Sequence, residues 1–204
     1  MPYESANLLT PGEAAAVAGV PIKAVYKTVG ERLPKASLVR RSGQTLLTPA
    51  AVVCVLLDYE LPKDVPIKVR RFVYEELKKG ASGRIEYGTK LFSYVVDPRT
   101  AAATVQDRMR RYQKAMQMIV ENPEIQGGAA TFKGTRLLVH PIAALLQQGV
   151  PEAELREDYP NLTPAMIEAA RIFAQAHPRR GRPRKPVWRA SRPRTSETAR
   201  RRSA

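Results

Sequence analysis

The sequence predicts a mainly α-helical protein, with an N-terminal winged helix-turn-helix and a C-terminal small helical bundle joined by a short β region and a long helix. Helix starts give the clearest evidence, because a hydroxyl N-cap followed by proline occurs at Thr10-Pro11, Thr48-Pro49 and Thr163-Pro164. The threonine oxygen accepts a hydrogen bond from an unpaired amide of the first turn, and proline has no amide to leave unpaired there. Glu13 completes a capping box with Thr10.

Residues 1–61 are expected to form the winged helix-turn-helix head. A helix from Pro11 is broken at Gly19, and a second helix restarts at Pro21. The stretch SLVRRSGQTLLT then predicts a hairpin with Ser42-Gly43 at its tip, and a third helix follows through the apolar run AVVCVLL. This order of two helices and a basic wing resembles the DNA-binding head of MerR-like regulators.

Five side chains of the head are candidates for DNA contact. Early residues of a recognition helix reach base edges in the major groove, and wing arginines bind phosphates or enter the minor groove. The candidates are Lys23, Tyr26 and Lys27 on the second helix, and Arg40 and Arg41 on the hairpin. An ordinary solvated helix face and a charged hairpin tip remain the alternative interpretation.

Residues 62–120 are expected to link the two helical regions and are a possible dimerisation region. A helix over IKVRRFVYEELKK precedes two strand-like segments, RIEYG and KLFSYVV, around Gly88. Pro98 then starts a long helix that runs through Val120. A stripe at helical spacing, formed by Met109, Tyr112, Met116 and Ile119, is expected to be core or partner surface rather than a cofactor site.

Residues 121–178 predict the helical bundle from turns and caps. Gly127-Gly128 leads into a tight hairpin at Lys133-Gly134, His140-Pro141 opens a helix, and Gly149 ends it. Arg136, within the Gly-Thr-Arg motif, is interpreted as a structural hydrogen-bond hub. The order of motifs resembles the VapB-type antitoxin domain in these positions: Pro123, Gly127, Gly128, Gly134, Thr135, Arg136, Val139, His140, Ile142, Gly149, Tyr159, Pro160, Leu162, His177, Pro178, Gly181, Arg182 and Pro183.

That resemblance implies an antitoxin of a VapBC toxin–antitoxin pair. Such a protein binds a PIN-domain ribonuclease, which is acidic and Mg-dependent, blocks it, and usually binds the operator DNA of its own gene pair. Operators of such regulators are usually palindromic, so a homodimer is expected. One departure from the family pattern is Ala129-Ala130, where such domains often carry proline. The alternative is a transcriptional or architectural DNA-binding protein with no toxin partner.

Residues 179–204 form a basic tail rich in arginine and proline. From Pro178 onward the sequence has eleven Lys and Arg residues and one acidic residue, Glu197. This segment therefore carries +10 of the total net charge of +15, and the rest of the chain carries +5. With so few apolar residues it is expected to be disordered by itself. The candidate binding residues are Arg179, Arg180, Arg182, Arg184 and Lys185.

Three interpretations of the tail remain open. Its Arg-Gly-Arg-Pro sequence fits the AT-hook pattern, which lies in a narrow A·T minor groove. Its guanidinium groups also suit the carboxylates that hold Mg²⁺ in a PIN ribonuclease. The third interpretation is a solvated tail without a partner.

Catalysis, cofactors and metals are not expected. The sequence has no Gly-rich phosphate loop, nucleophile elbow or paired acids in a matched setting, so it is not predicted to be an enzyme. One cysteine, Cys54, and two histidines, His140 and His177, do not suit a zinc site, and Cys54 is interpreted as a packed thiol. No signal peptide or membrane span is recognised, so a cytoplasmic protein is expected.

Overall fold

The computed structural model describes residues 8–31, 33, 38–41 and 43–178. Across these residues the chain forms eight α-helices and three two-stranded antiparallel sheets, which confirms the prediction of a mainly helical protein. Ser42 and the predicted tail, residues 179–204, lie outside the described residues. Within the described ranges no helix has the length and apolarity that a membrane crossing requires.

The first helices form where the threonine caps predict them. The order is α1 (Pro11–Ala18), α2 (Ile22–Glu31), the hairpin β1 (Leu38–Arg41) and β2 (Gln44–Leu47), and α3 (Pro49–Glu60). The capping box of α1 is present in full, since Glu13 N donates to Thr10 Oγ1 at 3.4 Å and Thr10 N donates to Glu13 Oε2 at 2.7 Å. Gly19 ends α1 in the left-handed conformation, with a φ of 69°.

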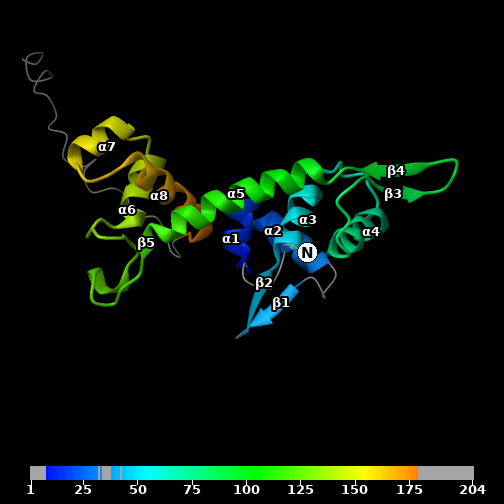
Figure 1. Cartoon of the computed structure of the whole chain (residues 1–204), viewed down its shortest axis with the longest axis horizontal. Coiled ribbons are helices and arrows are strands. Elements are labelled where there is room, and N and C mark those ends of the chain that lie inside the picture. The colour runs from blue at the N-terminus through cyan, green and yellow to red at the C-terminus, as the bar shows by residue number, and fades with distance from the viewer. Residues whose placement is uncertain (1–7, 32, 34–37, 42, 179–204) are drawn as a thin grey trace, which may run out of the picture.

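The middle of the chain forms α4 (Ile67–Lys78), the hairpin β3 (Ile85–Gly88) and β4 (Ser93–Val96), and the long helix α5 (Arg99–Gln117). Tyr87 faces Tyr94 across the hairpin, and the Phe72 ring of α4 lies 5.1 Å from the Tyr87 ring. Figure 1 shows this hairpin protruding at one end of an elongated molecule, with α5 running back towards the C-terminal helices.

The predicted long helix is shorter than the sequence suggests. It ends at Gln117, and the two β-branched residues that follow form β5 (Ile119–Val120), which pairs with β6 (Thr131–Phe132). The prediction was wrong here because helical spacing of apolar residues does not show that a later strand is available for pairing. Met109 and Tyr112 of the predicted stripe are buried, as expected.

The C-terminal part continues through a short 3₁₀ helix, η2 (Gln126–Gly128), and then α6 (Val139–Gln147), α7 (Glu152–Asp158) and α8 (Pro164–Ala176). The buried hydrophobic residues form two cores, one among the N-terminal helices and one among the C-terminal elements. The C-terminal core also includes Ala115 of α5. Helix α8 packs on α6, on α5 and on α1, and its last residue, Ala176, belongs to the core of the N-terminal helices. Helix α8 therefore packs against both the N-terminal helices and the C-terminal helices.

Gly12 of α1 lies in close contact with the last residue of α8. A Cβ at this position would stand 2.4 Å from the carbonyl oxygen of Ala176. We expect Gly12→Ala to lower the free energy of unfolding by about 1–3 kcal/mol, because backbone atoms must move apart. Urea denaturation measures this.

The matched control is Gly30→Ala, because Gly30 also lies in a helix but an added Cβ would meet nothing within 4 Å. That change should leave stability unaltered or raise it by up to about 1 kcal/mol, the difference in helix propensity. Equal effects of the two substitutions would contradict the tight contact at Gly12.

Candidate nucleic-acid interface

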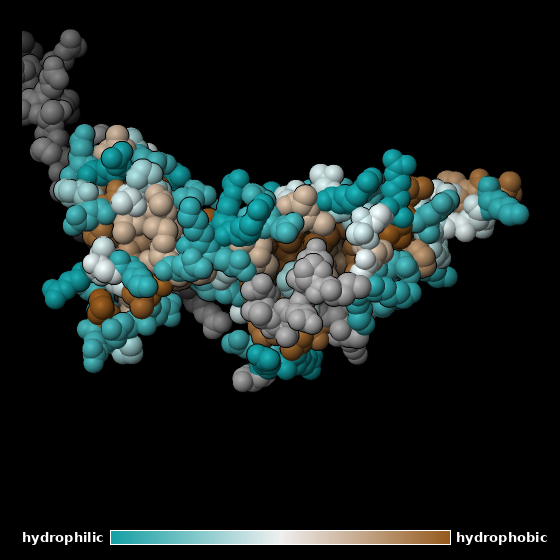
Figure 2. Space-filling view, viewed as in Figure 1, coloured by the Kyte–Doolittle hydropathy of each residue, from teal (hydrophilic) through white to brown (hydrophobic). Residues whose placement is uncertain are grey.

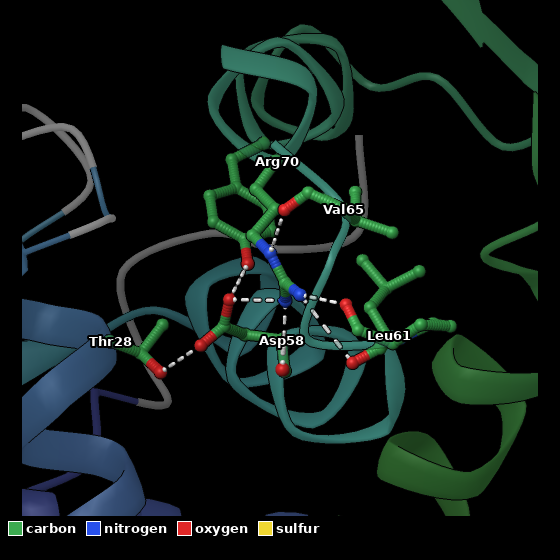
Figure 3. Close-up of polar contacts among 7 residues, drawn as sticks. Thr28, Asp58, Leu61, Val65 and Arg70 are labelled. Atoms are coloured by element: carbon green, nitrogen blue, oxygen red, sulfur yellow. Dashed lines mark hydrogen bonds and ion pairs between the residues drawn. The ribbon is translucent and has the colours of Figure 1, made fainter. Parts of the chain in front are cut away.

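A buried polar cluster fixes the inner side of α2. Asp58 of α3 is its centre: Thr28 Oγ1 donates to Asp58 Oδ2 at 2.8 Å, and both Tyr74 OH and Arg70 Nη1 donate to Asp58 Oδ1, at 2.8 and 2.9 Å (Figure 3). The side chains of Arg70 and Asp58 are 3% and 5% exposed. Burial, together with the charge of Asp58, raises the pKa of Tyr74 well above its usual value, so the phenol remains a donor.

Arg70 also fastens the loop between α3 and α4. Its guanidinium donates to the carbonyl oxygens of Asp58 at 3.0 Å and of Val65 at 3.1 Å, and it also reaches those of Leu61 and Pro62. The Asp58 carbonyl belongs to the last turn of α3, where carbonyls lack a partner within the helix, and the other acceptors lie in the C-cap and the loop that follows. This cluster was not predicted from the sequence, although an aspartate near the end of an apolar helix is a signal for such a cluster.

The neighbouring Cys54 is 3% exposed, which confirms the prediction of a packed thiol. Burial raises the pKa of the thiol well above its usual value, so the thiolate does not form near neutral pH. Cys54 is therefore part of the support beneath α2 and not a reactive group.

The opposite side of α2 carries the candidate recognition residues. Lys23, Tyr26 and Lys27 are all exposed, and Tyr26 is 58% exposed although it is a large aromatic residue. Their spacing of three and four residues places them on one helix face. Val25 and Thr28, in contrast, are buried and hold the helix against α3. The fold thus presents two lysines and one aromatic ring to solvent on a helix that is fixed from behind.

The two wing arginines do not form a single patch. Arg40 faces Thr45 and Arg41 faces Gln44 across the β1–β2 hairpin. Because successive side chains of a strand point to opposite faces, Arg40 and Arg41 lie on different sides of the hairpin. Arg40 borders a hollow that is also lined by Arg71 and Glu75 of α4. The five candidate residues of the head are therefore exposed, but they are not gathered on one surface.

A second hollow lies where α2, the hairpin and the C-terminal helices meet. We call it the junction hollow; its lining is Thr10, Pro11, Gly12, Ile22, Tyr26, Gln44, Thr45, His140, Ala176, His177 and Pro178. The hollow brings Tyr26 of α2 next to the first two residues of β2. His140 and His177, the two histidines of the sequence, both line this hollow. Each ring also contacts Phe173, at a centroid distance of 5.1 Å for His140 and 4.7 Å for His177.

Glu13 of α1 contacts both His177, which lines the junction hollow, and Tyr112 of the long helix α5. Tyr112 OH of α5 donates to Glu13 Oε1 at 2.6 Å, and His177 Nε2 lies 3.7 Å from the same oxygen. Burial and this hydrogen bond raise the pKa of Tyr112 well above its usual value, so it donates at neutral pH. Among the described residues there is no group of His, Cys, Asp and Glu side chains that could hold a metal ion.

The Gly-Thr-Arg motif forms the predicted tight turn. Gly134 has a φ of 76°, Thr135 Oγ1 donates to the Phe132 carbonyl at 2.9 Å, and Leu137 N donates to Thr135 Oγ1 at 3.1 Å. Arg136 is exposed and makes no hydrogen bond or ion pair with any residue of the described ranges, so its interpretation as a structural hub was wrong. Thr135 and the backbone already supply the bonds that close the turn.

Comparison with known proteins locates a family within this chain. Residues 119–174 match the family described as "Protein of unknown function (DUF433)". The match runs from β5 into α8, so it takes in the Gly-Thr-Arg turn and helices α6 and α7.

The similarity to one relative extends over most of the chain. It is "Uncharacterized protein y4eO" of Sinorhizobium fredii (strain NBRC 101917 / NGR234), which is 25% identical over 190 residues, 88% of this chain and 86% of the relative. No solved structure matches the chain. The sequence similarity therefore extends well beyond the residues that match the family.

Proposed function

We propose that the protein is an antitoxin that binds and neutralises a PIN-domain ribonuclease and represses its own operon by binding operator DNA. The observation that carries the DNA-binding part is the construction of α2. Its inner residue Thr28 is locked to Asp58, while Lys23, Tyr26 and Lys27 face solvent next to a basic hairpin. A winged helix-turn-helix uses a helix and hairpin in this order, with the early residues of the second helix in the major groove.

The toxin-binding part rests on the order of motifs in residues 121–183, which resembles VapB-type antitoxins. The family match over residues 119–174 supports treating this segment as a unit that recurs in other proteins. In this proposal the protein acts in the cytoplasm by binding alone, without a cofactor or a catalytic group. The tail residues Arg179, Arg180, Arg182, Arg184 and Lys185 lie outside the described residues and are candidates for either the toxin or the DNA.

The proposal includes a homodimer formed through residues 62–120. The β3–β4 hairpin carries three large apolar side chains with high exposed fractions: Leu91 at 99%, Phe92 at 64% and Val95 at 58%. Figure 2 shows hydrophobic surface on this protruding end. Exposed apolar patches and open strand edges favour association. Sedimentation of the full chain and of its Val95→Lys variant tests this, and a monomeric wild-type chain would contradict it.

Co-purification is the decisive experiment for the antitoxin. The tagged full chain is co-expressed with a PIN-domain protein encoded beside its gene, and both retention and RNA cleavage are measured. We expect the two proteins to elute together and cleavage to stop, with the PIN-domain protein alone as the active control. If the chain neither retains the neighbour nor suppresses its RNA cleavage, the antitoxin assignment fails.

The second candidate function is a DNA-binding transcriptional or architectural protein without a toxin. It is favoured by the Arg-Gly-Arg-Pro sequence at residues 180–183, which follows the AT-hook pattern, together with the exposed face of α2. Specific DNA binding, together with no binding to any PIN-domain protein encoded beside the gene, would support this function over the antitoxin.

A further inference from the structure

The Gly-Thr-Arg turn is fixed at its base. Phe132 of β6, directly before the turn, is fully buried, and β6 pairs with β5. Lys133 N donates to the carbonyl of Met118, the C-cap of α5, at 2.8 Å. The Thr135 hydroxyl closes the turn from within, since it both donates and accepts a hydrogen bond. The backbone that carries Arg136 is therefore held by contacts to a strand and to the end of a helix.

The outer side of the turn is open. Gly134 is exposed, and a Cβ added to it would meet nothing within 4 Å. Arg136 borders a hollow together with Thr135, Leu137 and Asn161, the last of which lies between α7 and α8. Arg136 and Asn161 are both exposed, and neither side chain has a hydrogen bond or ion pair with another described residue. A guanidinium and an amide thus border the same hollow without a partner from the described part of the chain.

Most arginines of the described ranges already bind an acceptor. Those with a hydrogen bond or ion pair are Arg70, Arg71, Arg84, Arg99, Arg108, Arg110, Arg111 and Arg171. Within these ranges the exceptions are the two wing arginines, Arg156 on α7, and Arg136. Arg156 is followed by Glu157 and Asp158, whereas Arg136 shares with Lys133 a turn that contains no acidic residue. The turn is therefore a local concentration of positive charge.

We propose that Arg136 forms a forked ion pair with a carboxylate on the surface of a protein partner, and that the Asn161 amide donates to the same group. This inference rests on the proposed toxin binding, and it places one contact for the toxin at the Gly-Thr-Arg turn. A guanidinium presents two parallel donors in the geometry of a carboxylate. Arginine is enriched among the few residues that dominate protein interfaces. An arginine on a fixed turn suits this role, because little of the backbone has to be ordered on binding.

The charge of the surrounding segment favours a carboxylate over a nucleic-acid backbone. Residues 121–178 contain four Lys and Arg residues and seven Asp and Glu residues, and all seven acids are exposed. The segment thus has a net charge of −3, which opposes the approach of a duplex with closely spaced phosphates. A single carboxylate needs only the local positive charge that Lys133 and Arg136 supply.

Binding of the full chain to the PIN-domain protein encoded beside its gene, measured by biolayer interferometry, tests the proposal. The test variant is Arg136→Ala. Its matched control is Arg156→Ala, which removes another exposed arginine without a described partner from the same segment. A third variant, Arg136→Lys, keeps the charge but loses the forked pair of donors. Urea denaturation of each variant should give the wild-type stability, because Arg136 has no partner among the described residues.

We expect Arg136→Ala to weaken binding to the PIN-domain protein at least about tenfold, the effect of losing hydrogen bonds to a charged group. Arg136→Lys should recover only part of this loss, because an ammonium group cannot make the forked contact. Arg156→Ala should bind like the wild type. The affinity of all three variants for DNA upstream of the gene should stay unchanged.

Three results would overturn this inference alone, while the wild-type chain still binds the PIN-domain protein. The first is wild-type affinity in Arg136→Ala, including the case in which only DNA binding falls. The second is an equal loss in Arg156→Ala, which would mean that only the overall charge matters. The third is full recovery in Arg136→Lys, which would exclude the forked pair. A wild-type chain that does not bind the PIN-domain protein would overturn the proposed function, and this inference with it.

Discussion

Replacing Arg70 with alanine is expected to lower the free energy of unfolding by about 3–5 kcal/mol, because it leaves the buried carboxylate of Asp58 without its counter-ion. The side chain of Asp58 is 5% exposed, so its carboxylate is shielded from bulk solvent. The same change removes the donor for the carbonyl groups of Leu61, Pro62 and Val65. Urea denaturation of the full chain, followed by circular dichroism, measures the loss.

The matched control for Arg70 is its neighbour. Arg71 is exposed and donates one hydrogen bond, from Nη2 to the carbonyl of Glu31 at 3.1 Å, so Arg71→Ala should cost less than about 1 kcal/mol. The double change Asp58→Leu with Arg70→Met should be milder than Arg70→Ala, since it removes both charges together. An effect of Arg70→Ala no larger than that of Arg71→Ala would show that the cluster does not stabilise the head.

Replacing both Lys23 and Lys27 with alanine is expected to weaken operator binding by about 2 kcal/mol or more, which is roughly thirtyfold. Both side chains are exposed on α2, so the fold should not change. Binding of the PIN-domain partner should remain intact, because the proposed toxin contacts lie elsewhere in the chain. Gel-shift titration with operator DNA and co-purification with the partner measure the two effects in the same samples.

A charge-matched variant separates recognition from general electrostatics. Lys78→Ala with Lys114→Ala also removes two exposed lysines, but from α4 and α5. It should reduce DNA affinity far less than the α2 variant at moderate salt, where distant charges are screened. Equal losses in the two variants would mean that α2 is not the recognition helix.

The sequence by itself determined the helices, because their signals are local. Thr10, Thr48 and Thr163 each accept the predicted hydrogen bond at the start of α1, α3 and α8. The turn at Gly134 and the β1–β2 hairpin depend on residues only a few positions apart, so they were also predictable. The exposure of Lys23 and Lys27 was predictable from the helical spacing of α2, whereas the structure decided that Val25 faces inward and Tyr26 faces solvent.

Tertiary structure alone decided the features that join distant segments. The pairing of Ile119 with Phe132 ended α5 early, and the guanidinium of Arg70 found its partner Asp58 across the α3–α4 loop. Such contacts depend on geometry in three dimensions, and charge or apolarity at one position does not identify the partner. The junction hollow is of the same kind: Tyr26 and Pro178 are far apart in the sequence, and the packing of α8 on α1 brings both into its lining.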